Sequence, residues 1–262
     1  MNTKNNFTVN FNETPFLETS YVASHIERLN WRSEVLLANN REAIANKRVL
    51  DLASHDGRFS YACLALGARH VTGVEGRAHL VSRADESLSS LGYAREKFHF
   101  VHADLFDYLQ DVEPGSFDII LCFGVFYHMI KQVEFLRQIS RIKPAHLILD
   151  TFVAKEHTEK VDFWRIHLAL RRMIRAVGDT FRNRKRNAGC LVFKYERSQK
   201  DGATIDSSGL IAWPTGSLVE VLLRYYGFEF KDIDWHGQAI DDWSRIKDYK
   251  TGKRLSWIAQ PT

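Results

Sequence analysis

The chain alternates between short apolar stretches and longer amphipathic ones, and this alternation predicts an α/β fold. The apolar stretches predict strands at residues 48–52, 70–74, 98–103, 117–123 and 146–152. The amphipathic stretches predict helices at residues 58–66, 79–91, 104–109 and 131–142. Strands without a polar face are buried on both sides, so we expect a parallel sheet covered by helices on both faces. Right-handed crossovers make this a doubly wound fold.

Both ends of the chain depart from this repeat. Residues 19–45 have apolar residues at helical spacing, which predicts one or two helices before the first strand. After the fifth strand, we expect residues 155–187 to be an arginine-rich helical insertion. Beyond it the composition predicts a strand, a helix and two further strands, at residues 190–195, 217–226, 228–235 and 254–259. With no helix predicted between them, the last two strands should pair antiparallel at one edge of the sheet.

The composition is that of an ordinary globular protein. Of 262 residues, 45% are apolar and 26% are charged, which excludes a disordered, collagenous or fibrous chain. Three widely spaced cysteines (Cys63, Cys122 and Cys190) make neither a disulfide framework nor a zinc site. No signal peptide is visible, and no apolar run approaches the roughly 20 residues that span a bilayer. We therefore expect a soluble, cytoplasmic protein without a metal.

The charge is unevenly distributed along the chain. The net charge is +4, whereas Lys155 to Lys200 alone holds 13 basic and 5 acidic residues, a local +8 that leaves about −4 for the rest. This asymmetry indicates an acidic partner for the insertion. Within it, Arg171 and Arg172 have guanidinium groups suited to a phosphate or a carboxylate. A solvated helix face is the alternative interpretation of the same charges.

Acidic residues follow three successive predicted strands. Asp51 ends the first strand, in Asp-Leu-Ala-Ser-His-Asp-Gly57, and Glu75 and Asp104 follow the second and third. Ligands of such sheets bind beyond the carboxyl ends of the strands, where an acid after the second strand accepts hydrogen bonds from ribose hydroxyls. Asp104 can accept from the amine of a base, or it caps a helix. A dinucleotide site would need G-x-G-x-x-G in the first loop, where only Gly57 is present.

These motifs resemble the class I S-adenosylmethionine-dependent methyltransferases over about residues 45–152. The resemblance implies that the first loop wraps the methionine part of the cofactor, that Glu75 holds the ribose and that Asp104 holds the adenine amine. The family's usual first loop is D-x-G-x-G-x-G, and here Ala53 and His55 stand at the first two glycines. The cofactor site expected from this resemblance comprises Asp51, Ala53, Ser54, His55, Gly57, Glu75, Gly76, Asp104, Leu105, Phe123 and Gly124.

A narrower likeness begins at Phe117 and runs to Tyr127-His128. The stretch Phe-Asp-Ile-Ile-Leu-Cys-Phe-Gly-Val-Phe-Tyr-His128, followed by an apolar strand that ends in Asp150-Thr, is similar to the tRNA wobble-uridine carboxymethyltransferases. Trp213-Pro-Thr-Gly-Ser-Leu and a late Lys-Arg-Leu-Ser-Trp are similar to the same group. The likeness implies that Tyr127 and Arg254 help to hold a carboxylated cofactor.

Tyr127 and His128 follow the fourth strand, where a methyl acceptor would approach the donor. We expect them to be the catalytic pair, with His128 as a general base because its intrinsic pKa suits that work. A histidine that merely packs under the rim of the sheet is the alternative. Arg171, Arg172, Trp213 and Arg254 are the residues expected to bind the acceptor.

The sequence therefore predicts a seven-stranded, Rossmann-like methyltransferase fold with an antiparallel edge strand and a helical insertion after strand five. Its parts are expected to be an N-terminal helical cap, a cofactor-binding core, a basic substrate-cover insertion and a C-terminal helix with edge strands, at 1–45, 46–153, 154–212 and 213–262. The predicted activity is methyl transfer from S-adenosylmethionine to an oxygen or nitrogen of a small, anionic metabolite, sugar or lipid-linked acceptor. The alternatives are a tRNA-modifying methyltransferase, an NAD-dependent oxidoreductase and a non-catalytic nucleoside-binding module. The oligomeric state is not predicted.

Overall fold

The computed structural model describes residues 6–16, 25–155, 188–196 and 203–262. Its centre is a seven-stranded sheet of order β3-β2-β1-β4-β5-β9-β8. The strands of this sheet are β1 (Arg48–Leu52), β2 (His70–Glu75), β3 (Phe98–His102), β4 (Ile119–Phe123), β5 (His146–Phe152), β8 (Phe228–Asp232) and β9 (Arg254–Pro261). Strands β1 to β5 are parallel, and β9 is antiparallel to both of its neighbours, β5 and β8. The predicted sheet and the antiparallel pair at its edge are confirmed.

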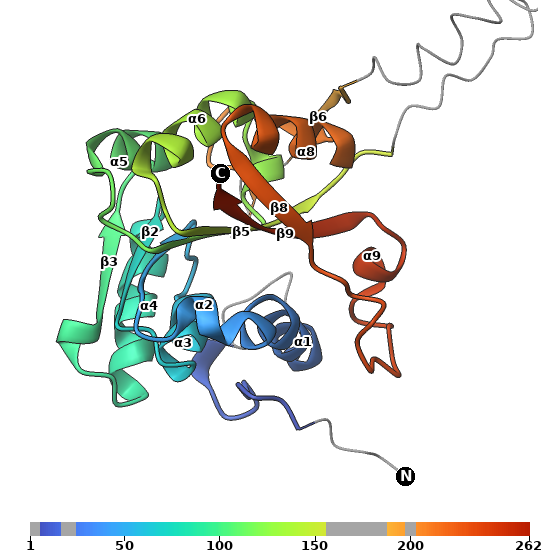
Figure 1. The fold of residues 1–262 in the computed structure, drawn as a ribbon. Helices are drawn as coiled ribbons and strands as arrows, with labels where there is room; N and C mark the ends of the chain where they lie inside the picture. Colours follow the sequence, from blue (N-terminus) through green and yellow to red (C-terminus); the bar gives the residue numbers. More distant parts are fainter. Residues whose placement is uncertain (1–5, 17–24, 156–187, 197–202) are drawn as a thin grey trace, which may run out of the picture.

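Helices cover both faces of this sheet (Figure 1). One face carries the N-terminal helices and the first two crossovers, namely α1 (Ile26–Leu36), α2 (Arg41–Ile44), α3 (Arg58–Ala65) and α4 (Ala78–Ser90). The other face carries α5 (Leu105–Asp111), α6 (Gln132–Ile142) and α8 (Gly216–Tyr225). Short 3₁₀ turns complete the connections, namely η2 (Ala38–Asn40), η3 (Arg95–Lys97) and η4 (Phe126–His128).

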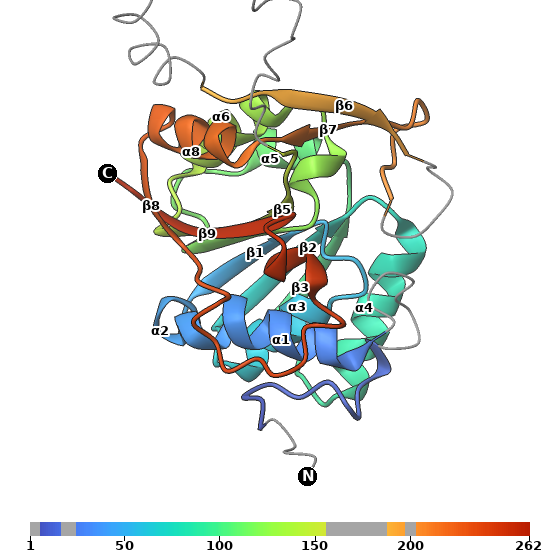
Figure 2. The same cartoon turned by 90° about the vertical axis from the view of Figure 1, so that its right-hand side faces the viewer.

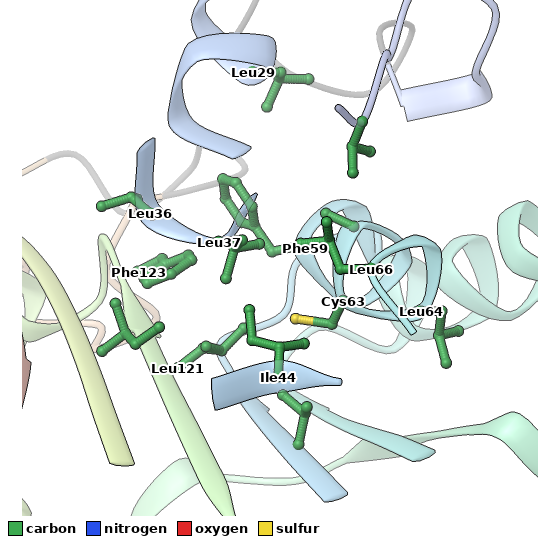
Figure 3. Packing of buried hydrophobic residues seen from close by; sticks show 14 of the residues in the cluster. Leu29, Leu36, Leu37, Ile44, Phe59, Cys63, Leu64, Leu66, Leu121 and Phe123 are labelled. Atoms are coloured by element: carbon green, nitrogen blue, oxygen red, sulfur yellow. The ribbon is translucent and has the colours of Figure 1, made fainter. Parts of the chain in front are cut away.

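The central strands are apolar because each faces two cores. All five residues of β4 are buried, and successive side chains alternate between the two clusters, with Ile119 and Leu121 in one and Ile120 and Cys122 in the other. Figure 3 shows the first cluster, where side chains from α1, α3 and β4 meet, among them Leu36, Cys63 and Leu121. Burial on both faces fixes each strand's register, because a slip by one residue would exchange the two sets of side chains.

A second, two-stranded sheet lies beside α6 and α8 (Figure 2). Strands β6 (Leu191–Tyr195) and β7 (Leu210–Pro214) pair antiparallel, with Val192 opposite Trp213. The sequence predicts β6 but not β7, because Leu210 to Pro214 contains a proline and follows a polar loop. In the structure Pro214 is the last residue of β7, a position that proline tolerates. The predicted boundary between 212 and 213 therefore falls inside a strand.

The prediction of no helix between the last two strands is wrong. A single turn, α9 (Lys247–Lys250), lies between β8 and β9. It forms because Ile246 and Tyr249, three positions apart, are both buried in the first core cluster. None of the helices in the described ranges is long and apolar enough to cross a membrane.

Candidate active site

A cavity of about 380 Å³ opens at the carboxyl ends of the parallel strands. Strands β1 and β4 are neighbours at its centre, and the chain proceeds from them in opposite directions across the sheet. This reversal creates a crevice in which ligands of open α/β sheets bind. The volume lies within the range of roughly 300–1,000 Å³ that is typical of small-molecule sites.

The loop after β1 follows a backbone path that glycine adopts most readily. Ala53, His55 and Gly57 all have positive φ, at 54°, 54° and 81°. For a residue with a side chain this left-handed conformation costs roughly 1–2 kcal/mol. The loop persists because its backbone is tied at both sides: Ser54 N donates to the Val74 carbonyl at 3.0 Å, and His55 N donates to Glu75 Oε2 at 3.1 Å.

Glu75 lies buried in the cavity wall at the end of β2. Its Oε1 accepts from Arg77 N at 3.1 Å, and its Oε2 accepts from His55 N. A carboxylate has about four acceptor positions, so both oxygens retain capacity for a ligand. Two backbone donors hold the side chain in place, and Glu75 is therefore a fixed acceptor for hydroxyl groups.

Asp51 lies deeper in the same wall. Burial raises the pKa of Asp51 to about 7, although the Ser60 hydroxyl opposes the shift by donating to Oδ2 at 2.7 Å. Asp104 follows β3 and caps α5. Its Oδ1 accepts from Phe106 N at 2.8 Å and from Asp107 N at 3.3 Å. Asp104 nevertheless lines the cavity, so the capping role and the predicted ligand role are compatible.

A histidine–carboxylate pair lies beside the same cavity, and His128 is one of the residues that line it. His128, at the end of η4, places Nδ1 2.7 Å from Oε2 of Glu196, which immediately follows β6. A carboxylate only accepts, so Nδ1 donates, and in the neutral ring Nε2 is the basic nitrogen. Burial alone would raise the pKa of Glu196, but the hydrogen bond from His128 outweighs it and holds that pKa below its ordinary value.

Behind this pair, two arginines share one carboxylate. Asp150 is fully buried, and its Oδ2 accepts from Arg32 Nη2 at 2.7 Å and from Arg254 Nε at 2.8 Å. Burial would raise the pKa of Asp150, but the charges of Arg254 and Arg32 hold it well below its ordinary value. Two guanidinium groups against one carboxylate leave a net positive charge beside the cavity, which both arginines line.

Arg32 retains an unused donor. The residue is 8% exposed, and its Nε is buried without a hydrogen-bond partner among the described residues. Gly124, at the end of β4, makes room for this group of charges. It has φ +79°, and a Cβ there would lie 3.0 Å from Arg254 Nη2. A side chain at position 124 would displace the arginine from the cavity wall.

Comparison with known families identifies the fold and the chemistry. The family model described as a methyltransferase domain matches residues 44–192, which is more than half of the chain. The chain belongs to this family. The predictions of a class I methyltransferase and of S-adenosylmethionine as its cofactor are thereby confirmed.

Curated relatives of this methyltransferase are similar to it over about half of the chain. A tRNA U34 carboxymethyltransferase of Idiomarina loihiensis is 30% identical over 132 residues, which are 48% of this chain and 40% of that protein. One of Helicobacter pylori is 27% identical over 128 residues, which are 47% of this chain and 48% of that protein. The chain therefore aligns with less than half the length of these relatives.

Solved structures share the methyltransferase fold at low sequence identity. The N-terminal domain of EvdMO1, crystallised with S-adenosylhomocysteine bound, has a TM-score of 0.58 at 16% identity, over 86% of this chain and 79% of that one. A putative S-adenosylmethionine-dependent methyltransferase of Listeria monocytogenes has a TM-score of 0.55 at 11% identity, over 91% of this chain and all (100%) of that one. At such identities the likeness concerns the fold alone.

The structure brings most of the predicted site residues of this methyltransferase together. The residues that line the cavity are Asp51, Ala53, Ser54, His55, Glu75, Gly76, Asp104, Leu105, Phe123, Gly124, Tyr127, His128 and Arg254. Two predicted residues are not among those lining it. Gly57 lies at the N-terminus of α3, and Trp213 stacks on Phe152 with ring centroids 5.2 Å apart. Arg171 and Arg172 lie outside the described residues.

Several residues of the site are not among the sequence predictions. Arg28 and Arg32 come from α1, and a cationic pair four residues apart on a helix was a usable signal. Glu196, Thr204 and Ile205 come from the segment between β6 and β7. Nothing in the sequence near Glu196 connects it with His128, because 68 residues separate them.

Proposed function

We propose that this methyltransferase moves the methyl group of S-adenosylmethionine to an oxygen or nitrogen of a small, anionic acceptor. The observation that carries the proposal is the His128–Glu196 pair, which lies at the same cavity as Glu75. One end of the cavity suits a nucleoside, and the other end offers a base. Methyl transfer to a protonated heteroatom requires both functions within one site.

The residues at the strand ends fit the cofactor. Glu75 has free acceptor positions for ribose hydroxyls, and Asp104 has an oxygen that does not cap α5. Leu105 and Phe123 supply apolar contacts in the same cavity. When bound, S-adenosylmethionine supplies an electrophilic methyl group on a positively charged sulfur.

His128 is proposed to remove the proton of the acceptor. Glu196 fixes the imidazole so that Nδ1 donates and Nε2 accepts, which is the arrangement in which a carboxylate orients a histidine base. A base of this kind accelerates proton transfer by roughly 10²–10⁴-fold. Tyr127, whose pKa is raised by burial, stays protonated and packs beside His128 with ring centroids 4.0 Å apart.

Arg32 and Arg254 support the anionic character of the acceptor. They share Asp150, so a carboxylate or phosphate in the cavity would meet uncompensated positive charge. The unused Nε of Arg32 is a buried donor, which is costly unless a ligand or water satisfies it. An anionic group on the acceptor satisfies both conditions.

A methyl-incorporation assay tests this proposal. The purified protein is incubated with methyl-labelled S-adenosylmethionine and a panel of hydroxy acids, amino acids, sugar phosphates and bulk tRNA. We expect label in a carboxylate- or phosphate-bearing small molecule, and loss of that label in His128→Ala. Label that enters only uncharged acceptors, or that persists at full rate in His128→Ala, would contradict the proposal.

Modification of tRNA is the second candidate function. The curated relatives are named as tRNA enzymes, and the Lys155–Lys200 segment carries a net charge of +8. Arg254 and Tyr127 would then hold a carboxylated cofactor, as the likeness to that group implies. Binding of bulk tRNA across a salt series decides between the candidates, because a polyanion releases several counterions and its affinity falls steeply with salt. We expect no steep slope, and tRNA methylation with such a slope would establish the second candidate.

A further inference from the structure

Residues 203–205, ahead of β7, place an apolar side chain beside Gly76 at the cavity. Ile205 is 57% exposed and lines the cavity together with Thr204. Two hydrogen bonds hold these three residues in place: Thr204 N donates to Glu196 Oε2 at 3.0 Å, and Arg77 Nη2 donates to the Ala203 carbonyl at 2.7 Å. An exposed isoleucine held beside a cavity is a side chain that a ligand would bury.

Ile205 occupies the space of a side chain that the chain lacks at position 76. A Cβ built on Gly76 would lie 2.3 Å from Ile205 Cδ1, whereas the next nearest atoms are 3.7 and 3.8 Å away. The backbone of Gly76 does not have a positive φ. Its backbone therefore does not require glycine, and the missing side chain leaves room for Ile205.

The position of Gly76 indicates which part of a ligand Ile205 would meet. Gly76 directly follows Glu75, the proposed ribose acceptor, and the Ala103 carbonyl oxygen is among the atoms nearest to where a Cβ of residue 76 would lie. Asp104 and Leu105 follow Ala103 and line the same part of the cavity. A nucleobase attached to a ribose held at Glu75 would extend into this region, where its flat, apolar faces need apolar contacts.

We propose that Ile205 forms one wall of the nucleobase site and substitutes for a side chain at position 76. The inference rests on the proposed function, because it assumes that a nucleoside cofactor binds at Glu75. It extends that function by assigning cofactor recognition to a segment outside the parallel sheet. Thr204, next to Ile205, donates its N–H to Glu196, so the wall for the nucleobase is hydrogen-bonded directly to the partner of the proposed base.

The test uses three variants and two ligands. Ile205→Ala removes the wall, and the double variant Ile205→Ala with Gly76→Val restores an apolar side chain from the other side of the gap. Val133→Ala is the control, because Val133 is an exposed aliphatic side chain that is not among those lining the cavity. Calorimetry measures the affinity of each protein for S-adenosylhomocysteine and for adenosine, and thermal melting confirms that each variant is folded.

We expect Ile205→Ala to lower the affinity for both ligands roughly tenfold, because both ligands carry the same nucleobase and lose one apolar contact. The double variant should recover to within about threefold of the wild type, and Val133→Ala should bind both ligands normally. Unchanged adenosine affinity in Ile205→Ala, or a folded double variant that stays as weak as Ile205→Ala, would overturn the inference. If the wild type binds neither ligand, the proposed function fails as well, whereas equal binding by wild type and Ile205→Ala removes the inference alone.

Discussion

The proposed cofactor end and the proposed acceptor end of the cavity are built in different ways. The residues proposed for the cofactor, Asp51, Glu75 and Asp104, each lie at or shortly after the end of a parallel strand, so the sheet itself brings them together. The residues proposed for the acceptor, His128, Glu196 and Arg32, come from η4, the residue after β6, and α1. The proposed cofactor end therefore follows from the order of the parallel strands, while the proposed acceptor end depends on contacts between segments that are far apart in the sequence.

This difference allows cofactor binding and methyl transfer to be tested separately. A change at the strand ends should lower the affinity for the cofactor, whereas a change at the histidine pair should slow methyl transfer and leave the cofactor bound. A change in the buried arginine network should affect folding, because those charges stabilise the structure as well as line the cavity. Variants at each of these places therefore test whether the two ends are independent.

The strongest loss is expected from the histidine pair. In Glu196→Gln the amide oxygen can take the place of Oε2 and still accept from both Thr204 N and Nδ1 of His128, but the negative charge that stabilises a protonated imidazole is lost. His128→Ala, which removes the base itself, should lower kcat by roughly 10²-fold or more, measured on the acceptor found in the incorporation assay. Glu196→Gln should lower kcat by a smaller factor, because the imidazole keeps its orientation. The exposed Glu134→Gln is the control, and full kcat in Glu196→Gln would remove Glu196 from the mechanism.

The next effect is on stability, in Asp150→Asn. Removing this carboxylate leaves Arg32 and Arg254 without their shared counter-charge in a buried site, which typically costs about 3–5 kcal/mol. Denaturant unfolding measures the change. Asp118→Asn weakens a half-buried ion pair with Arg48 near the surface and should cost less, about 1 kcal/mol. Equal losses of unfolding free energy in the two variants would show that Asp150 stabilises the protein no more than an ion pair near the surface does.

The same contrast explains how much of the site was predictable. Asp51, Glu75 and Asp104 could be found because strand ends are visible in a local pattern of apolar residues. Glu196 could not, because its partner His128 lies 68 residues away and the intervening segment gives no register. Trp213 is not among the residues that line the cavity, but it stacks on Phe152 and lies edge-on to Tyr127, with ring centroids 5.8 Å apart. Its predicted role at the acceptor stays a prediction.

The fold shows the same limit. The parallel strands and their helices were predicted because each has a clear period and a buried face, as in β4. Strand β7 was missed because a proline and a preceding polar loop hid it, and α9 was missed because one turn of helix is too short to show a period. Ala53 and His55 stand at two of the family's usual glycines, and both residues take up the left-handed conformation of a glycine.

A third prediction concerns pH. Burial raises the pKa of Asp51 to about 7, so the folded protein holds this proton more tightly than the unfolded chain does. The stability from this group is complete below the unfolded value of about 4 and is lost as the pH rises through about 7. Relative to Asp51→Asn, the cofactor-free wild type should therefore become less stable between these limits, as measured by denaturant unfolding. A difference between the two proteins that does not change with pH would contradict this assignment.

The weakest effect is expected in the loop after β1. Ala53→Gly should stabilise the protein by up to about 1 kcal/mol, because it releases left-handed strain at the cost of a more flexible unfolded chain. The matched control is Ala62→Gly inside α3, which should destabilise by roughly 0.5–1 kcal/mol or more. Thermal melting shows whether the melting temperature of each variant rises or falls. A loss of stability in Ala53→Gly would show that the loop does not store this strain.

The division of the cavity into a binding end and a chemical end is tested by the affinity of three proteins for S-adenosylhomocysteine, measured by calorimetry without any acceptor. We expect that the wild type binds, that Glu75→Ala loses roughly 1.5–3 kcal/mol because the hydrogen bonds to a charged carboxylate are gone, and that Glu196→Gln binds within about threefold of the wild type. This result would separate the cofactor end from the acceptor end. Unchanged affinity in Glu75→Ala, or an equal loss in Glu196→Gln, would contradict that division.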